Sequence, residues 1–228
     1  MYSRHKMTLI LLTCSAATST AAIAAPVPCV PPPGFVDTPH PAVAPVEKLV
    51  SHSEDIVIRR PLDVVLDTES KLSLEKTIDR NSSLPSVSGT YMLTHGDYGS
   101  PGSRRLTCLT DGSSLVEEVL ESRRDKNSGH FRYVVWNYTT EQARPIVYGV
   151  GDFVTTDIGA EGTRKHWTYS FQLNRDRFPG YLGRMGDFLF RVGFLDRQYA
   201  KMMRGTLAGL KAGIEGNDLV EASSGPPK

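Results

Sequence analysis

The sequence predicts an α+β domain with a seven-stranded antiparallel sheet wrapped around a long C-terminal helix, and with two short helices after the first strand. Three observations predict this class. A β-rich segment precedes two short helical stretches, six further strand candidates are joined mostly by tight turns, and the last periodic segment carries one wide apolar stripe at helical spacing. Strands joined by short connections pair antiparallel, so we expect a meander.

The first strand is expected over residues 52–60, where three β-branched residues stand together. Pro61 follows this strand, and proline is well tolerated in the first turn of a helix. The apolar spacing beyond it indicates two short helices, over residues 62–69 and 71–78.

Six strands are expected after these helices, and turn residues separate them. Asp111-Gly112 is a strong signal for a two-residue hairpin. Two further glycine-containing turns are expected at residues 126–129 and 159–162. The expected strands cover residues 87–94, 104–110, 115–122, 131–138, 146–156 and 165–173.

The long C-terminal helix is expected from about residue 179 to residue 212. Apolar residues recur there at every third or fourth position, and most of the arginines and lysines lie off that stripe. Gly183, Gly186 and Gly193 each cost about 1 kcal/mol of helix propensity relative to alanine. Glycines so placed suggest that the helix approaches another surface closely, or that it bends.

The composition excludes several classes of partner. The chain has 228 residues, with 26 Lys and Arg against 25 Asp and Glu, and therefore a net charge of +1. A nucleic-acid-binding protein would carry a basic excess, so we expect no nucleic-acid partner. Three cysteines are too few for a disulfide scaffold or a four-thiolate zinc site. No apolar run reaches the roughly 18 residues that span a bilayer.

Motifs for metals and cofactors are missing from the sequence. His95, His130 and His166 stand far apart, without the short spacing that metal-binding histidines show. No G-x-S-x-G elbow, phosphate-binding loop or G-x-G-x-x-G fingerprint occurs. We therefore expect no metal and no cofactor.

Residues 1–24 are typical of an export signal. A short basic region is followed by an apolar core of seven residues, and small residues then lead to an A-x-A-like cleavage site at Ala22-Ile23-Ala24. This predicts a periplasmic or secreted protein. A second interpretation uses Leu11-Leu12-Thr13-Cys14, which resembles a bacterial lipobox, and lipidation of Cys14 would then anchor the protein to a membrane. Thr13 departs from that pattern.

The chain divides into a domain with two extended flanks. Residues 25–47 are rich in proline and predict an extended tether, residues 48–216 form the domain, and residues 217–228 read as a disordered tail. Cys29 in the tether could pair with Cys108. We expect instead that Cys29 is a free or intermolecular thiol, because the tether is predicted to be mobile.

One stretch of the sequence resembles a known superfamily. Residues 58–65, Ile-Arg-Arg-Pro-Leu-Asp-Val-Val, look like the strand-to-helix entry of the SRPBCC superfamily, which includes the START and pollen-allergen-like proteins. Gly102-Ser103-Arg104-Arg105 and Trp167 also fit, and the resemblance covers about residues 52–215. It is strongest to the polyketide cyclase/dehydrase and lipid-transport branch. It implies a helix-grip fold with an internal cavity, but the superfamily holds binders, transporters, cyclases and hydrolases.

Strand alternation suggests which residues would line such a cavity. Trp167, Tyr169 and Phe171 share one face of the last strand and should point inward. In the strand at residues 131–138 two sets compete for the inward face: one is Val134, Trp136 and Tyr138, and the other is Phe131, Tyr133 and Val135. The residues expected to bind ligand are Trp136, Tyr138, Trp167, Tyr169, Phe171, Met185, Phe188, Leu189, Val192 and Glu118.

Glu117 and Glu118 supply the sharpest candidate for acid–base chemistry. They are adjacent on a strand, so they point to opposite faces. Glu117 faces inward if Leu115 and Val119 do, and Glu118 faces inward with the opposite set. The sequence leaves both open, and Arg104, Arg105 or Arg132 could supply a partner for the inward carboxylate.

These features predict an exported protein that binds a hydrophobic small molecule or lipid in an internal cavity. The alternative is a polyketide cyclase/dehydratase-like enzyme that acts in the same cavity, with an inward glutamate, Tyr138 or His95 as acid or base. A third possibility is an interaction module whose cavity is packed shut. No catalytic residue is assigned.

Overall fold

The computed structural model of the chain describes residues 28–78 and 83–223, with side chains as far as Gly216. The expected signal peptide at residues 1–24 and the lipidation site at Cys14 lie outside these residues. In the described part, no helix is both long and apolar enough to cross a membrane.

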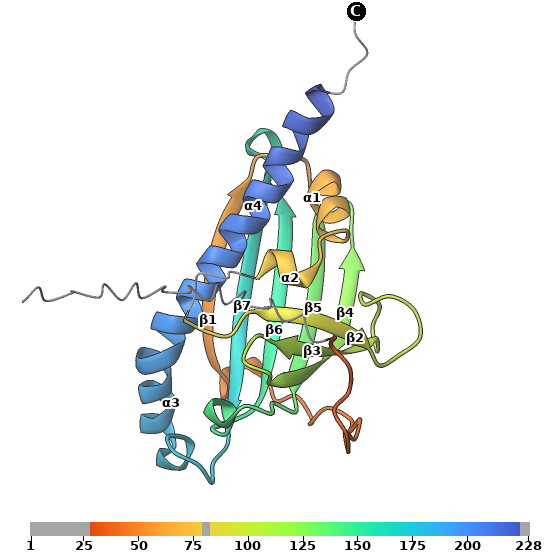
Figure 1. Cartoon of the computed structure of the whole chain (residues 1–228). Coiled ribbons are helices and arrows are strands. Elements are labelled where there is room, and N and C mark those ends of the chain that lie inside the picture. Colours follow the sequence, from red (N-terminus) through yellow and green to blue (C-terminus); the bar gives the residue numbers. More distant parts are fainter. Residues whose placement is uncertain (1–27, 79–82, 224–228) are drawn as a thin grey trace, which may run out of the picture.

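Seven strands form one antiparallel sheet, which confirms the predicted class and strand count (Figure 1). The order across the sheet is β1-β7-β6-β5-β4-β3-β2, so the first strand pairs with the last and every other neighbour is a hairpin partner. The strands are β1 (Val50–Ile58), β2 (Val87–Met92), β3 (Arg104–Leu109), β4 (Ser114–Arg124), β5 (Ser128–Trp136), β6 (Ile146–Asp157) and β7 (Thr163–Leu173).

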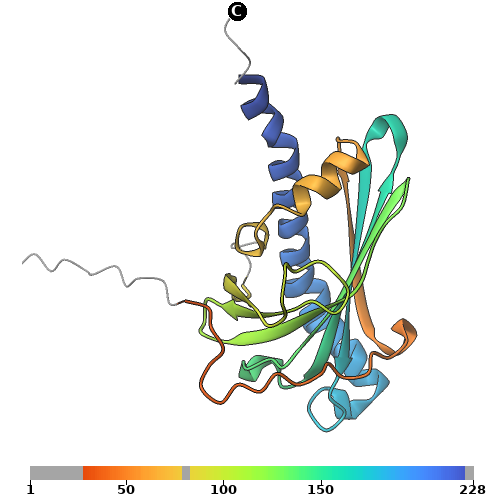
Figure 2. The same cartoon turned by 90° about the vertical axis from the view of Figure 1, so that its right-hand side faces the viewer.

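All the main helices lie on one side of the sheet, which we call its inner face (Figure 2). Two short helices, α1 (Leu62–Glu69) and α2 (Leu74–Thr77), follow β1 as expected. Pro61 precedes α1, where its missing N–H costs nothing. The long α4 (Ala200–Ser223) contacts β1, and α1 and α2 contact α4. This arrangement is a sheet that grips a C-terminal helix.

The C-terminal helical region has three parts instead of one uniform helix. It begins with α3 (Arg184–Phe190), continues as the π-helical segment η5 (Arg191–Tyr199) and ends as α4. The predicted start at residue 179 is too early, because Gly183 has a φ of +60° and ends the preceding turn. The helix also runs to Ser223, beyond the expected end at about residue 212.

Gly186 shows the close approach that the sequence suggested. A Cβ atom there would lie 1.9 Å from the carbonyl oxygen of Pro179, so only glycine lets α3 pack against the loop before it. Gly193 behaves differently, since a Cβ atom at that position would meet nothing within 4 Å. Gly193 lies in the π-helical segment η5, and the wider turns of this segment change which side chains of the helix face the sheet.

Buried apolar residues lie on both faces of the sheet. On the inner face, Trp167, Tyr169 and Phe171 pack with Leu195 and Met203 of the helical region. On the opposite face, which we call the outer face, a second cluster contains Leu106, Val116, Val134, Trp136, Tyr148 and Val150. The sheet is therefore the middle layer of a three-layer structure.

The third layer is the proline-rich segment at residues 28–49, which we call the N-terminal strap. Phe35, Val43 and Leu49 pack on the outer cluster, and the backbone N–H of Ala44 donates to the hydroxyl of Tyr148 at 2.8 Å. The strap is extended, as a proline-rich chain should be. The strap therefore covers the outer face of the sheet, whereas the sequence predicted a tether that stands away from the domain.

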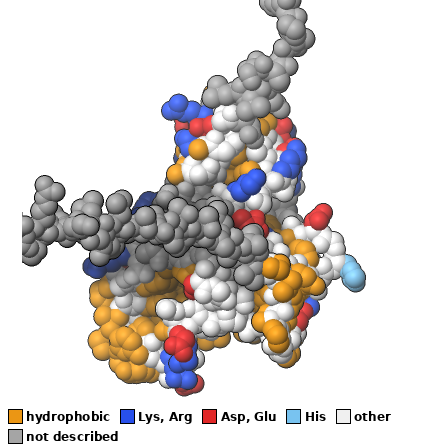
Figure 3. Space-filling model, in the orientation of Figure 1, with side chains coloured by type: hydrophobic (Ala, Val, Ile, Leu, Met, Phe, Trp, Pro, Cys, Tyr) orange, Lys and Arg blue, Asp and Glu red, His pale blue; other side chains and the backbone are white. Residues whose placement is uncertain are grey.

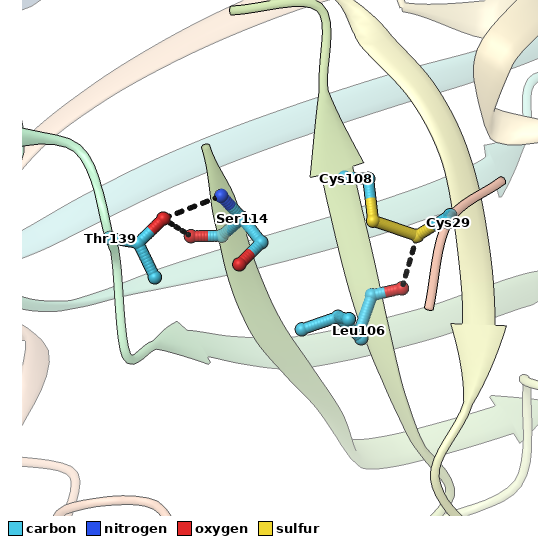
Figure 4. Close-up of a disulfide and its surroundings, with 5 residues drawn as sticks. All are labelled: Cys29, Leu106, Cys108, Ser114 and Thr139. Atoms are coloured by element: carbon cyan, nitrogen blue, oxygen red, sulfur yellow. Dashed lines mark hydrogen bonds between the residues drawn. A yellow bond between two sulfur atoms is a disulfide. The ribbon is translucent and has the colours of Figure 1, made fainter. Parts of the chain in front are cut away.

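A disulfide between Cys29 and Cys108 fixes the start of the strap to β3 (Figure 4). The expectation of a free or intermolecular Cys29 is therefore wrong. Its premise fails because the strap has apolar side chains that pack on the sheet, and this packing brings Cys29 to the outer face. The Cys29 sulfur lies 3.9 Å from the carbonyl oxygen of Leu106, a contact without a hydrogen because the sulfur is oxidised.

Candidate ligand-binding site

The inner face carries a continuous surface of aromatic rings from three adjacent strands. Strand register places Tyr133 and Tyr169 in one row across the sheet, with Gly151 between them. The next row contains Phe131, Phe153 and Trp167, and the Phe153 and Trp167 rings are stacked with centroids 4.8 Å apart. Residues opposite each other on neighbouring strands share a face, so these rings form one surface.

Two glycines of β6 make room for the tyrosine rings. A Cβ atom on Gly151 would lie 2.2 Å from the ring of Tyr133, and one on Gly149 would lie 2.7 Å from the ring of Tyr169. The tyrosines on β5 and β7 therefore lie across the backbone of β6. Glycine in a strand is otherwise unfavourable, and here it permits a close approach of side chain to backbone.

The helical region supplies the facing side chains. The Tyr199 ring lies 4.7 Å from that of Tyr169 and 5.0 Å from that of Phe171, measured between centroids. Leu195 and Met203 are fully buried between helix and sheet. At this end of the inner face, the helix and the sheet are in direct contact.

Trp167, Tyr169 and Phe171 are buried at the centre of the inner face, whereas several aromatic side chains around them keep some access to solvent. Tyr133, Tyr138, Phe153, Phe194 and Tyr199 pack on the buried inner cluster, yet each is only partly buried. Desolvation nevertheless raises the pKa values of Tyr133, Tyr138 and Tyr199. These phenols therefore remain neutral hydrogen-bonding groups at ordinary pH.

A buried ion pair lies on the inner face of the neighbouring strands. Arg105 on β3 stands directly opposite Glu117 on β4, and its Nε donates to the carboxylate at 2.5 Å. The Glu117 side chain is only 9% exposed. The guanidinium also lies 3.7 Å from the centre of the Tyr98 ring. Burial acts to lower the pKa of Arg105, but the charge of Glu117 and the hydrogen bond to it outweigh burial and raise the pKa, so the guanidinium stays charged.

Two buried hydroxyls beside this ion pair have no hydrogen-bond partner among the described residues. They belong to Tyr98 and to Thr107, which follows Arg105 by two positions on the same face of β3. An unpaired buried hydroxyl costs about 1–3 kcal/mol, so native proteins rarely keep one without a reason. We call Tyr98, Arg105, Thr107 and Glu117 the inner polar cluster.

A second buried charge lies towards α1. Lys165 of β7 is 2% exposed, and its Nζ lies 2.7 Å from the carboxylate of Glu69 on α1. The same ammonium lies 4.4 Å from the centre of the Phe153 ring, a cation–π distance. The aromatic surface is thus flanked by two ion pairs, each of which is neutral overall.

The described residues give no support to metal chemistry. No three His, Cys, Asp or Glu side chains gather there in a way that could hold an ion. A surface cleft of about 740 Å³ lies outside the inner face, near the start of α1. Its lining contains four basic and four acidic side chains, so it offers no preference for a charged ligand. The inner face remains the candidate site.

The structure brings four of the expected site residues together. Tyr138, Trp167, Tyr169 and Phe171 all pack in the inner cluster. Val192 is half-buried on η5. Whether these residues bind a ligand stays a prediction. His95, which was considered as an acid or base, is exposed in the loop between β2 and β3 and does not join them.

Trp136 and Glu118 lie on the outer face, so their expected placement in the cavity is wrong. Trp136 is buried in the outer cluster, with the ring of His40 from the strap 5.9 Å away. Glu118 lies 3.9 Å from the same histidine. Glu117 is the glutamate that faces inward. Alternation could not decide between the faces, because the strap buries the outer one as well.

The sequence prediction is also wrong for three residues of the helix. It placed Met185, Phe188 and Leu189 in the cavity, whereas they face solvent. They are 61%, 61% and 40% exposed, although their spacing continues the apolar stripe of the helix. A π-helix takes more residues per turn than an α-helix. Counting back from Leu195 through η5 therefore brings Phe190 to the inner face instead, and Phe190 is buried there.

Sequence reasoning missed three polar residues of the inner face. Lys165 precedes Trp167 by two positions, so the alternation that placed Trp167 inward also placed Lys165 inward. Thr107 follows Arg105 by two positions, so alternation also places these two residues on one face. Alternation gives no prediction for Tyr98, because Tyr98 lies in a turn, and tertiary structure decides whether that turn passes over Arg105.

No protein-family model matches the chain, and no curated protein sequence matches it. Solved structures do match. The di-domain ARO/CYC protein StfQ from the steffimycin biosynthetic pathway is 14% identical, with a TM-score of 0.51 over 75% of this chain and 52% of that chain. This chain therefore spans about half of that two-domain protein.

A protein from Helicobacter pylori, described as hypothetical protein jhp0584, is 13% identical, with a TM-score of 0.51 over 78% of this chain and 98% of that one. The structure of Ara h 8.0201 is 14% identical, with a TM-score of 0.45 over 75% of this chain and 97% of that one. At these identities the likeness concerns the fold. The predicted helix-grip fold is confirmed.

Proposed function

We propose that this chain is an exported protein that binds a hydrophobic small molecule or lipid between the inner face of the sheet and the C-terminal helix. One observation carries the proposal. An aromatic surface, several of whose rings are only partly buried, lies on the same face of the sheet as a buried ion pair with two unpaired hydroxyls beside it. Such a surface offers apolar area for burial, and the hydroxyls offer hydrogen bonds to one polar end of a ligand.

Apolar burial and a few hydrogen bonds are enough to account for ligand binding, with no catalysed reaction. Burying about 200 Å² of apolar surface contributes roughly 5 kcal/mol, from which the cost of immobilising the ligand is subtracted. Hydrogen bonds to Tyr98 and Thr107 would add less in magnitude but would fix the orientation. Because Arg105 and Glu117 neutralise each other, an uncharged polar group suits this end better than a carboxylate.

Export is supported by the disulfide between Cys29 and Cys108. Disulfides persist in oxidising compartments and are rare in the cytosol. The signal-like segment at residues 1–24 points the same way, and we propose a periplasmic or secreted location. Lipidation of Cys14 is the alternative, and it would place the same domain at a membrane surface.

Native mass spectrometry of the purified protein, followed by extraction in organic solvent, tests for a bound ligand directly. A co-purified apolar compound is expected, and its absence from the extract would count against tight binding. A second experiment locates the ligand by using the two tryptophans, which lie on opposite faces of the sheet.

The uncharged dye Nile red serves as the apolar probe in that experiment. In Trp136→Phe the remaining Trp167 should be quenched as the dye binds. In Trp167→Phe the remaining Trp136 should respond weakly, because it lies behind the sheet under the strap. Equal quenching in both variants, or none in either, would contradict binding at the inner face.

A cyclase/dehydratase-like enzyme is the second candidate, and the inward position of Glu117 favours it. A carboxylate held by Arg105 beside buried phenols could accept or return a proton from a positioned chain. Incubation with a reactive poly-β-keto chain, with products separated by chromatography, tests this. Glu117→Gln should abolish product formation, whereas the matched variant Glu118→Gln on the outer face should not. Equal effects of the two variants would reject this candidate.

A further inference from the structure

Five large apolar side chains are exposed within twelve residues at one end of the molecule. They are Phe178, Tyr181, Met185, Phe188 and Leu189, with exposures of 60%, 59%, 61%, 61% and 40%. We call them the α3 patch. Figure 3 shows apolar side chains massed at the lower left corner, where α3 lies in Figure 1. Soluble monomers rarely expose so contiguous a patch without a partner for it.

Specific contacts hold the patch in place. Arg175 forms a two-pronged ion pair with Asp187 of α3, at 2.7 and 3.2 Å, and it also donates to the carbonyl oxygen of Gly180 at 3.2 Å. Gly186 packs against the loop at Pro179, where no other residue would fit. The buried side of α3 is thus fixed, and its apolar residues are kept facing solvent.

The charge around the patch is positive. Residues 175–191 contain four arginines and two aspartates, a net charge of +2, in a chain whose overall charge is +1. Arg177, Arg184 and Arg191 are exposed. Aromatic and aliphatic side chains surrounded by arginine guanidinium groups are the composition that binds the interface of an anionic bilayer.

The shape and charge argue against the other occupants. A second copy that docked by a two-fold axis would bring together two patches of the same positive net charge, and like charges at a contact are unfavourable. The patch lies at a protruding end of the molecule (Figure 1), whereas a peptide needs a groove. A bilayer accepts a protruding apolar end.

We propose that the α3 patch inserts into the surface of an anionic lipid bilayer, with the surrounding arginines bound to lipid phosphates. Phe178, Tyr181, Met185, Phe188 and Leu189 would enter the boundary between headgroups and acyl chains. This contact is independent of lipidation at Cys14 and of any ligand on the inner face. It would place the π-helical end of the gripped helix at the membrane.

Co-sedimentation with vesicles tests the proposal, with the full-length chain prepared without lipid at Cys14 and checked by mass. Vesicles of phosphatidylcholine with 30% phosphatidylglycerol are the probe, and pure phosphatidylcholine is the comparison. Binding to the mixed vesicles is expected, and it should weaken as salt is raised because phosphate contacts are screened. Binding that ignores lipid charge and salt would overturn the electrostatic part.

Phe188→Ser should lower the partition coefficient at least about tenfold, since a whole phenyl ring leaves the apolar layer. Arg184→Gln should lower it about fivefold on mixed vesicles and little on neutral ones. The matched controls are Tyr91→Ser, an exposed aromatic residue on β2, and Arg164→Gln, an exposed arginine on β7. Each control should bind like the parent.

Two outcomes would overturn the proposal. In one, Phe188→Ser and Tyr91→Ser bind vesicles equally well, so that the patch has no special part in binding. In the other, sedimentation velocity shows that the parent is a dimer and that Phe188→Ser is a monomer, so that a second copy covers the patch. Circular dichroism confirms that the variants are folded, and both substitutions are at exposed positions.

Discussion

Arg105 and Glu117 stand directly opposite each other on β3 and β4, with 2.5 Å between the guanidinium Nε and the carboxylate. Their side chains are 15% and 9% exposed, so neither charge is fully hydrated. Removing one partner of such an ion pair destabilises the fold, because the other charge stays buried without a counter-charge. Replacing both partners with apolar residues changes the stability little. The pair is therefore better understood as part of a site than as a source of stability.

The first prediction follows from this asymmetry. Glu117→Leu should destabilise the fold by about 3 kcal/mol, because it leaves Arg105 buried without its counter-charge. The double variant Arg105→Met/Glu117→Leu should recover most of that loss. Urea denaturation followed by circular dichroism measures both. If the double variant is less stable than Glu117→Leu alone, the pair stabilises the fold and the prediction is wrong.

The second prediction concerns the disulfide. The Cys29–Cys108 bond closes a loop across a sequence separation of 79 residues, and the chain-entropy relation gives about 4.5 kcal/mol for such a loop. Cys29→Ser/Cys108→Ser should lose about that much stability. The strap should then loosen over Trp136, and its emission should move to longer wavelength. The Trp136→Phe background is the control, since Trp167 should not report the change.

The third prediction concerns the space above β6. Gly151→Ala would bring a methyl group to 2.2 Å from the Tyr133 ring, so the ring or the strand must move. We expect a loss of about 1–3 kcal/mol in the free energy of unfolding, together with altered Nile red binding. Gly193→Ala is the matched control. Its Cβ meets nothing within 4 Å, and alanine in a helix should be neutral or stabilising.

Most of the fold could be predicted because the signals were local. Turn residues such as Asp111-Gly112 and the apolar run of each strand placed seven strands and two short helices close to their observed bounds. The inner position of Trp167 also followed from alternation, because its neighbours on the other face are polar. Local signals of this kind need no knowledge of distant contacts.

Two parts of the site could not be predicted, for physical reasons that differ. On β4 and β5 both faces are apolar, since the strap covers Val116 and Trp136 from behind, so alternation carried no information about which face was inner. In the helix, the π-helical segment shifted the phase between Leu195 and Phe188. Neither the strap contact nor the shift is encoded in a short window of sequence.

The fourth prediction concerns pH. Both ring nitrogens of His130 lie near carboxylates, Nδ1 at 3.0 Å from Glu121 and Nε2 at 2.9 Å from Asp152. Burial acts to lower the pKa of His130, but the hydrogen bonds to Glu121 and Asp152 outweigh it and raise the pKa. The proton is therefore bound more tightly in the folded chain than in the unfolded one.

A raised pKa in the folded state means that His130 stabilises the fold at pH values below about 6.5, its value in an unfolded chain. That contribution is lost as the pH rises through the folded pKa. The parent should thus lose stability as the pH rises above about 6.5, and His130→Gln should show a flatter profile over the same range. Because the side chain is partly exposed, the difference should stay below about 1 kcal/mol.

Urea titrations at pH 5.5, 6.5, 7.5 and 8.5 measure this difference. His95→Gln, in the exposed loop between β2 and β3, is the control and should keep the slope of the parent. Glu121 contributes in the opposite sense, since the hydrogen bond from His130 lowers its pKa and its effect appears only at acidic pH. A slope that His130→Gln leaves unchanged would mean that the imidazole is neutral in the folded chain. A neutral imidazole carries only one N–H, so one of its two carboxylate contacts would then have no hydrogen bond.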